Sequence, residues 1–197
     1  MLIRPLVIKN FVSEELCSVM ATEFTIMRDT MKVLGGPGFD EIENSFAWYS
    51  PICFETLSTH IKSKVEQVVN KPLHSSYSYG RIYNKGSVLT KHTDRKSSEL
   101  TVSICLRKDI PWALNWEWEG QTLAFDADPG DAIIGCGSAT PHWRNPYEGE
   151  EHVQAFMQYV IAGGDYDHLK YDTRPCIGSP YELVNDVVRN EDKYYMD

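Results

Sequence analysis

Three side chains in the sequence are of the types that bind divalent transition metals, and their spacing allows them to meet. His92 and Asp94 stand two residues apart in the segment HTD, so that on an extended backbone both side chains project from the same face. His142 lies 50 residues after His92. Two neutral imidazoles and one carboxylate would leave a divalent ion with a residual positive charge and vacant coordination positions. The sequence therefore predicts a metal site at His92, Asp94 and His142.

The alternative interpretation of the HTD segment is an exposed pair at the end of a strand, since the chain contains six histidines. The metal interpretation is favoured because the segments between Asp94 and His142 have the pattern of strands in a jelly roll. That fold would bring His142 close to His92 and Asp94. Two histidines and one carboxylate on one face of an ion form the ligand set of non-haem Fe(II) oxygenases.

Short apolar segments separated by Gly, Pro, Asn and Asp predict a β core from about residue 75 to 162. This pattern is typical of a barrel or sandwich rather than of alternating strands and helices. The predicted strands are 76–83, 87–94, 100–107, 121–127, 130–136 and 151–162.

Two helices are predicted ahead of the β core. Residues 10–32 contain Ser13 as an N-cap, acidic residues in the first turn and apolar residues at helical spacing, and GGPG at 35–38 ends the helix. A second helix is predicted over 54–70. The predicted fold class is therefore mainly β with N-terminal helices, a double-stranded β-helix or jelly roll. At 197 residues, the chain is expected to form a single domain, 1–197, with helices at about 10–70 and an acidic C-terminal extension, 163–197, that is either an ordered wrap or a mobile tail.

Composition excludes several classes of function. The net charge of −9 is the wrong sign for a protein that neutralises nucleic-acid phosphates, so we expect no nucleic-acid partner. Five widely spaced cysteines without a CxxC pair indicate a reducing cytoplasm. No apolar run approaches the roughly 20 residues that span a bilayer, so no membrane association is predicted.

Four segments of the sequence resemble the Fe(II)- and 2-oxoglutarate-dependent dioxygenases, especially the branch of the prolyl 4-hydroxylases. NFVSEELC at 10–17 is similar to the usual opening of that branch, and the likeness extends from about residue 6 to 162. The resemblance implies a double-stranded β-helix, with His92, Asp94 and His142 as ligands of Fe(II), and with 2-oxoglutarate and O2 as co-substrates. The segments are RIYNKGSVLTKHTD (81–94), ELTVSICL (99–106), PGDAII (129–134) and PHWRNPYEG (141–149).

The resemblance also implies a Lys or Arg nine or ten residues after the second histidine, to bind the distal carboxylate of 2-oxoglutarate. Here those positions hold Glu151 and His152. The candidates are His152 as an imidazolium, Arg144 two residues after His142, and Arg107 on the strand after HTD. The fixed fork of an arginine grips a carboxylate well, whereas position favours the histidine. We predict that either Arg144 or His152 binds the distal carboxylate, and Arg107 is the third candidate. If all three side chains point away from the site, we expect another 2-oxo acid or no co-substrate.

Tyr83 is predicted to donate a hydrogen bond to the co-substrate, with packing as the alternative, because Cys105 stands where relatives often carry a tyrosine. Alternation along strand 100–107 is expected to turn Thr101, Ser103, Cys105 and Arg107 towards the interior.

Two further groups of residues carry alternative interpretations. Trp116 and Trp118 are either core residues or line the mouth of the cavity. Arg95 and Lys96, with Arg144, indicate either a basic spot for an acidic substrate or a surface paired in salt bridges.

The resulting hypothesis is an Fe(II)/2-oxoglutarate-dependent hydroxylase that acts on an unactivated C–H bond in a peptide or protein side chain, prolyl-like, or in a free amino acid. Demethylation of nucleic-acid bases is disfavoured by the acidic charge. The alternative is a cupin-like jelly-roll protein that binds a metal without oxygen chemistry.

Overall fold

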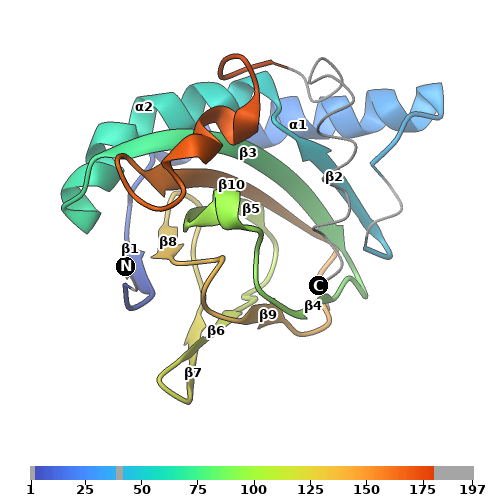
Figure 1. Cartoon of the computed structure of the whole chain (residues 1–197). Helices are drawn as coiled ribbons and strands as arrows, with labels where there is room; N and C mark the ends of the chain where they lie inside the picture. Colours follow the sequence, from blue (N-terminus) through green and yellow to red (C-terminus); the bar gives the residue numbers. More distant parts are fainter. Residues whose placement is uncertain (1–2, 39–41, 180–197) are drawn as a thin grey trace.

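Two antiparallel β-sheets and two N-terminal helices make up the structure, a computed structural model that describes residues 3–38 and 42–179 (Figure 1). The predicted fold class is confirmed. The elements are β1 (Leu6–Ile8), α1 (Glu14–Leu34), β2 (Ser45–Tyr49), α2 (Ile52–Val69), β3 (Leu73–Asn84), β4 (Leu89–His92), η1 (Lys96–Ser98), β5 (Leu100–Lys108), β6 (Leu114–Trp118), β7 (Gln121–Phe125), β8 (Ala132–Gly135), β9 (His142–Arg144), β10 (Glu151–Ile161) and η2 (Asp167–Thr173).

The chain passes back and forth between the two sheets. The six-stranded sheet has the order β1-β8-β5-β10-β3-β2, and the four-stranded sheet has the order β4-β9-β6-β7. From β3 to β10, consecutive strands alternate between the sheets, except that β6 and β7 form a hairpin within the smaller one. This winding is that of a double-stranded β-helix, and it brings β4 beside β9 although about 50 residues separate them.

The first helix begins and ends where the sequence predicts, within a few residues. The Ser13 side chain accepts a hydrogen bond from the backbone N–H of Leu16, at 3.3 Å, and Glu14 and Glu15 occupy the first turn. The helix ends at Gly35, whose φ of +64° is the left-handed conformation that glycine adopts readily. Among the described residues, neither helix combines the length with the apolar character that a membrane-spanning segment needs.

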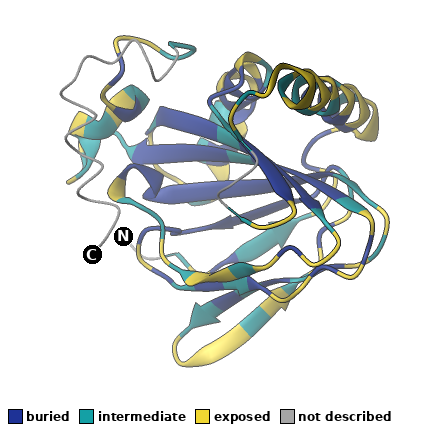
Figure 2. Ribbon diagram, turned by 90° about the vertical axis from the view of Figure 1, so that its right-hand side faces the viewer, coloured by how far each residue is buried: buried dark blue, intermediate teal, exposed yellow. Residues whose placement is uncertain are grey.

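Both helices cover the outer face of the six-stranded sheet (Figures 1 and 2). The main core lies between the helices and this sheet. Phe24 of α1 and Phe54 of α2 meet over Gly80 of β3, with ring centroids 5.0 Å apart. A Cβ atom at Gly80 would lie 2.4 Å from Phe24 Cζ and 2.6 Å from Phe54 Cε2. The glycine inside this predicted strand therefore permits the close approach of both helices to the sheet.

Several strands were not predicted. β1, β2 and β9 contain 3, 5 and 3 residues, too few for a periodic pattern to stand out, and β6 contains Trp116 and Trp118, a segment in which the sequence predicts no strand. β2 lies between the two helices in sequence and extends the sheet beside β3.

The part of the C-terminal extension that the structure describes, 163–179, is an ordered wrap against β3. Arg174 is buried, and its Nη2 lies 3.2 Å from Glu55 Oε2 and 3.0 Å from the backbone oxygen of Ser76. The rest of the extension, 180–197, lies outside the described residues.

Candidate metal centre

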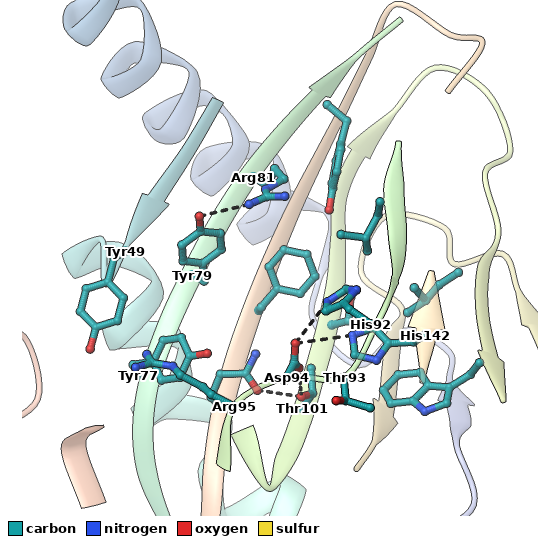
Figure 3. Close-up of a pocket in the computed structure, with 17 residues that line it drawn as sticks. Tyr49, Tyr77, Tyr79, Arg81, His92, Thr93, Asp94, Arg95, Thr101 and His142 are labelled. Carbon is teal, nitrogen blue, oxygen red and sulfur yellow. Dashed lines mark hydrogen bonds and ion pairs between the residues drawn. The ribbon is translucent and has the colours of Figure 1, made fainter. Parts of the chain in front are cut away.

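The predicted ligand residues meet at one end of the four-stranded sheet (Figure 3). His92 ends β4 and pairs in register with His142, the first residue of β9, and Asp94 follows two residues beyond His92. Their ligand atoms all lie within 4.8 Å of one another. Asp94 Oδ1 is 3.4 Å from His92 Nε2 and 3.6 Å from His142 Nε2. The three groups therefore point at one common position.

Backbone carbonyls fix the orientation of both imidazole rings. His92 Nδ1 lies 2.8 Å from the Thr90 oxygen, and His142 Nδ1 lies 3.2 Å from the Thr140 oxygen. Because a carbonyl can only accept, each Nδ1 carries the proton and donates it. The lone pair of each Nε2 is then left for a metal, which is the arrangement that outer hydrogen bonds commonly give to metal-binding histidines.

Asp94 is held by its backbone and by its second carboxylate oxygen. Its N–H donates to the Gly137 oxygen at 3.0 Å, and Oδ2 lies 3.2 Å from the hydroxyl of Thr101, which can donate to it. A Cβ atom at Gly137 would lie 2.3 Å from Asp94 Oδ2. Glycine at this position therefore leaves the space that the carboxylate occupies.

The local electrostatics favour the ligand forms of Asp94 and His142, whereas they favour the protonated form of His92. Burial raises the pKa of Asp94, but the two nearby imidazoles and the Thr101 hydroxyl lower it by more, so the pKa falls below its ordinary value. Burial lowers the pKa of His142 below its ordinary value. Burial also lowers the pKa of His92, but the Asp94 carboxylate and the Thr90 carbonyl raise it by more. The carboxylate is thus ionised, and His142 is neutral near pH 7.

A cavity of about 670 Å³ lies between the two sheets and includes all three residues (Figure 3). This volume is within the range of small-molecule sites, about 300–1,000 Å³. Most of its wall is aromatic or apolar. The lining residues are Tyr49, Tyr77, Tyr79, Arg81, Tyr83, Leu89, His92, Thr93, Asp94, Arg95, Thr101, Ser103, Leu114, Trp116, His142, Phe156 and Gln158.

Trp116 is both a core residue and a residue of the cavity wall, the two alternatives that the sequence left open. Its side chain is fully buried, and it also lines the cavity, where its ring stacks on His142 with centroids 4.8 Å apart. Trp118 is half-buried and does not line the cavity. Tyr83 lines the cavity as well, and its ring packs edge-on against Trp112 at 4.9 Å.

Arg144 lies one layer behind the cavity wall. Its guanidinium donates to the Trp112 oxygen and lies 3.4 Å, through Nη2, from Gln154 Oε1, while Gln154 in turn donates to Ser103 at 2.8 Å. Ser103 lines the cavity. Nε of Arg144 is buried and has no hydrogen-bond partner, and among the described residues no carboxylate is within ion-pair distance of this arginine. Burial lowers the pKa of Arg144.

The interpretation of His152 as an imidazolium is wrong. Burial and the neighbouring charge of Arg144 lower the pKa of His152 to about 3, so the ring is neutral near pH 7. Its Nε2 lies 2.6 Å from Gln154 Oε1, and its Nδ1 is buried without a partner. The ring does not line the cavity.

The expectation that Arg107 faces the interior is also wrong, because a β-bulge interrupts the alternation of β5. Cys105 pairs with Gln154 and Arg107 pairs with Val153, which leaves Leu106 as the extra residue. Arg107 consequently turns towards α1, where it bonds to Thr25 at 2.8 Å and forms an ion pair with Glu151.

Arg81 lines the cavity and was not among the predicted site residues. Its side chain is 8% exposed, and Nη2 lies 3.2 Å from the hydroxyl of Tyr79. The signal in the sequence is the alternation in SYSYGRIY, which places Tyr77, Tyr79, Arg81 and Tyr83 on one face of β3.

Among comparisons with known proteins, the one with solved structures finds similar folds. No protein-family model matches the chain, and no curated protein matches it. Among solved structures, a Pseudomonas putida prolyl-4-hydroxylase matches with a TM-score of 0.59 and 12% identity, over 80% of this chain and 92% of that one. HygX from Streptomyces hygroscopicus with nickel, 2-oxoglutarate and hygromycin B matches with a TM-score of 0.61 and 14% identity, over 80% and 82%.

A third similar structure is the prolyl hydroxylase from Trichoplax adhaerens in complex with a peptide fragment of the hypoxia inducible factor oxygen degradation domain. It matches with a TM-score of 0.62 and 13% identity, over 81% of this chain and 84% of that one. The chain therefore shares its fold, the double-stranded β-helix described above, with these solved structures.

Proposed function

We propose that the protein is an Fe(II)- and 2-oxoglutarate-dependent oxygenase that hydroxylates an unactivated C–H bond. The observation that carries the proposal is the convergence of His92 Nε2, His142 Nε2 and an oxygen of Asp94 inside a large cavity of this fold. Both imidazoles have their Nδ1 atoms engaged by backbone carbonyls. This donor set suits Fe(II) and leaves coordination positions for other ligands.

When bound, Fe(II) supplies the redox chemistry by which O2 and 2-oxoglutarate yield succinate, CO2 and a hydroxylated substrate. The chain's own residues hold the reactants and exclude water. Asp94 and the two histidines fix the ion, and Trp116 closes one side by stacking on His142. The tyrosines of β3 form an opposite wall.

The buried guanidinium of Arg144 fits the distal carboxylate of 2-oxoglutarate. A buried cation without an anionic partner is costly, by several kcal/mol. The unpartnered Nε of Arg144 lies in the same buried cluster as the unpartnered Nδ1 of His152, and Gln154 joins the two side chains. A carboxylate that reached Arg144 past Ser103 would supply the missing charge. We therefore assign Arg144 as the anchor, with Arg81 as a second cation on the cavity wall and Tyr83 as a hydroxyl donor.

The substrate is proposed to be a peptide or protein side chain, or a free amino acid. Support for a peptide comes from the similar prolyl hydroxylase whose structure contains a peptide fragment. HygX, whose structure contains hygromycin B, indicates that the same fold also accepts a small molecule.

The experiment is to measure CO2 released from 2-oxoglutarate labelled at C1, with purified protein, Fe(II) and O2. We expect release even without substrate, because uncoupled turnover needs only the ion, 2-oxoglutarate and O2. The matched control is His142→Ala, which should release none above background. Absence of release from the wild-type protein, together with binding of Zn(II) that 2-oxoglutarate does not perturb, would favour the cupin-like alternative.

A further inference from the structure

The sheets do not hold the three predicted ligands equally. His92 and His142 belong to two paired strands, whereas Asp94 lies in the segment between β4 and η1, outside any strand. A connecting segment moves more easily than a strand within a sheet. The carboxylate of Asp94 therefore depends on contacts with its surroundings to keep Oδ1 turned towards the two imidazoles.

Thr101 connects this carboxylate to the six-stranded sheet. It is the second residue of β5 and is 3% exposed. Its hydroxyl oxygen lies 3.2 Å from Asp94 Oδ2 and 2.8 Å from Oε1 of Gln158, which is 4% exposed (Figure 3). Thr101 and Gln158 are direct partners in the register of β5 and β10, the two central strands of the sheet. The sheet thus reaches the ligand outside the strands through one hydroxyl.

The structure leaves room for this contact at Gly137. A Cβ atom there would lie 2.3 Å from Asp94 Oδ2 and 2.3 Å from Thr101 Oγ1. The backbone oxygen of Gly137 also accepts a hydrogen bond from the N–H of Asp94, at 3.0 Å. A larger residue would push the carboxylate and the hydroxyl away, so the glycine permits the backbone to approach both groups.

The hydroxyl of Thr101 has one proton but faces two acceptors, the carboxylate of Asp94 and the amide oxygen of Gln158. A hydrogen bond to a carboxylate is about twice as strong as one between neutral groups, so the carboxylate is the better acceptor for this proton. A half-turn of the Gln158 amide exchanges Oε1 for Nε2, which donates to the hydroxyl oxygen. Both contacts of Thr101 then join a donor to an acceptor.

We propose that Thr101 and Gln158 are positioning residues of the metal site: Gln158 donates through Nε2 to Thr101, and Thr101 donates its proton to Oδ2 of Asp94. Oδ2 is thereby engaged. Oδ1, which lies 3.4 Å from His92 Nε2 and 3.6 Å from His142 Nε2, is left for the ion. The inference rests on the metal site of the proposed function but not on its oxygen chemistry.

The experiment measures the dissociation constant of Mn(II) without 2-oxoglutarate, from the electron paramagnetic resonance signal of the free ion. Thr101→Val keeps the shape of the side chain and removes the hydroxyl, and we expect it to bind Mn(II) at least about tenfold more weakly. Thr101→Ser keeps the hydroxyl and should stay within about threefold of the wild-type protein. This rescue separates the hydrogen bond from a merely structural role of the residue.

Gln158→Met tests the direction of the hydrogen bonds. We expect it to bind Mn(II) about three- to fivefold more weakly, because Thr101 loses the donor that orients its hydroxyl. If Thr101 instead donated to Gln158, the substitution would free that proton for Asp94, and binding would be unchanged or tighter. The double variant Thr101→Val, Gln158→Met should match Thr101→Val within about twofold, because Gln158 acts through the hydroxyl.

Two matched controls make the same changes far from the ligands. Thr122→Val and Gln121→Met lie at exposed positions of β7, and each should leave the dissociation constant within about twofold of the wild-type value. Urea denaturation of the metal-free proteins shows whether each variant is folded.

The proposal is overturned if Thr101→Val binds Mn(II) as the wild-type protein does, or if Thr101→Ser is as weak as Thr101→Val. It is also overturned if Gln158→Met binds unchanged or more tightly, if the effects of the two substitutions add, if a control weakens binding as much as its partner, or if wild-type protein binds no Mn(II). Should Thr101→Val not fold, Gln158→Met decides alone: weaker binding supports the proposal, and unchanged or tighter binding contradicts it. A protein that gives the expected Mn(II) constants but releases no CO2 would refute the proposed function and leave this inference standing.

Discussion

At the scale of single residues, hydrogen bonds to one atom of each side chain determine which atom is left to bind the ion. Carbonyls occupy Nδ1 of both histidines, and Thr101 lies against Oδ2 of Asp94, so the remaining donor atoms turn inwards together. The two-residue spacing of His92 and Asp94, the strand pattern between Asp94 and His142, and the resemblance to a known family together predicted the three residues from the sequence. Their orientation could not be predicted, because it depends on backbone atoms that the fold places.

Replacing the metal-site carboxylate tests this arrangement. We expect Asp94→Ala to abolish release of CO2 and to lower the affinity for Mn(II) at least tenfold, because a charged ligand is lost. The free energy of unfolding should change by no more than about 1 kcal/mol, since Asp94 contributes little apolar packing. Isothermal titration calorimetry and chemical denaturation measure the two effects. Gross unfolding of the variant, or unchanged Mn(II) binding, would contradict the assignment.

The role of Arg144 is tested by binding of N-oxalylglycine, an unreactive stand-in for 2-oxoglutarate, to the Mn(II)-loaded protein. Arg144→Met removes the charge but retains an unbranched side chain, and we expect the affinity to fall on the order of tenfold or more. The matched control is Arg107→Met, which lies on the α1 side of the sheet and should leave the affinity unchanged. Equal effects of both substitutions would show that Arg144 is not the anchor.

The charge of a candidate residue was harder to predict than its position. His152 occupies the place that the resemblance indicated, yet it is buried and neutral. Burial of an individual side chain cannot be read from one sequence, and neither can the pKa shift that follows from it. Arg81 was missed for a related reason, because alternation shows which residues share a face but does not show which face borders the cavity.

At the scale of elements, one bulge decides which face of the six-stranded sheet the Arg107 side chain of β5 occupies. The extra residue Leu106 in β5 turns Arg107 towards α1, whereas strict alternation predicts the opposite. A bulge of this kind has no periodic signature in the sequence. The longer elements followed their patterns: α1 has the predicted cap at Ser13, and β3 and β10 coincide with predicted strands.

The packing of the helices on β3 is tested at Gly80. We expect Gly80→Ala to lower the free energy of unfolding by about 1–3 kcal/mol, because its Cβ would overlap the rings of Phe24 and Phe54. Phe24→Leu should relieve part of this cost. The loss in free energy of unfolding of the double variant should therefore be smaller than the sum of the two single losses, by at least about 1 kcal/mol.

Gly120, in an exposed turn with no atom near its missing Cβ, provides the control for this coupling. Gly120→Ala combined with Phe24→Leu should be additive within about 0.5 kcal/mol in chemical denaturation. Additivity for the Gly80 pair as well would mean that the helices do not press on this glycine.

At the scale of the whole molecule, stability is linked to pH through a buried neutral histidine. The unfolded chain binds a proton at His152 below a pH of about 6.5, whereas the folded protein keeps the ring neutral down to about 3. Between these values the unfolded state binds more protons, so acidification favours unfolding. The stability contributed by this residue is therefore complete above about pH 6.5 and is lost as the pH falls.

We expect the free energy of unfolding to fall between pH 7.5 and 5.0 by about 2 kcal/mol more in the wild-type protein than in His152→Leu. Urea denaturation at the two pH values measures the difference. His60→Leu, an exposed histidine of α2, should retain the pH dependence of the wild-type protein. The same dependence in the His152 variant and the wild type would contradict the linkage.

In the proposed function, His92, Asp94 and His142 hold one ion that keeps room for a 2-oxo acid. The most direct measurement is a crystal structure of the protein with Mn(II) and N-oxalylglycine. We expect His92 Nε2, His142 Nε2 and an Asp94 oxygen on the ion, the compound chelated at adjacent positions, and its far carboxylate on Arg144. The proposed function would be contradicted by an ion bound elsewhere. It would also be contradicted by an ion whose coordination positions are all filled by protein atoms.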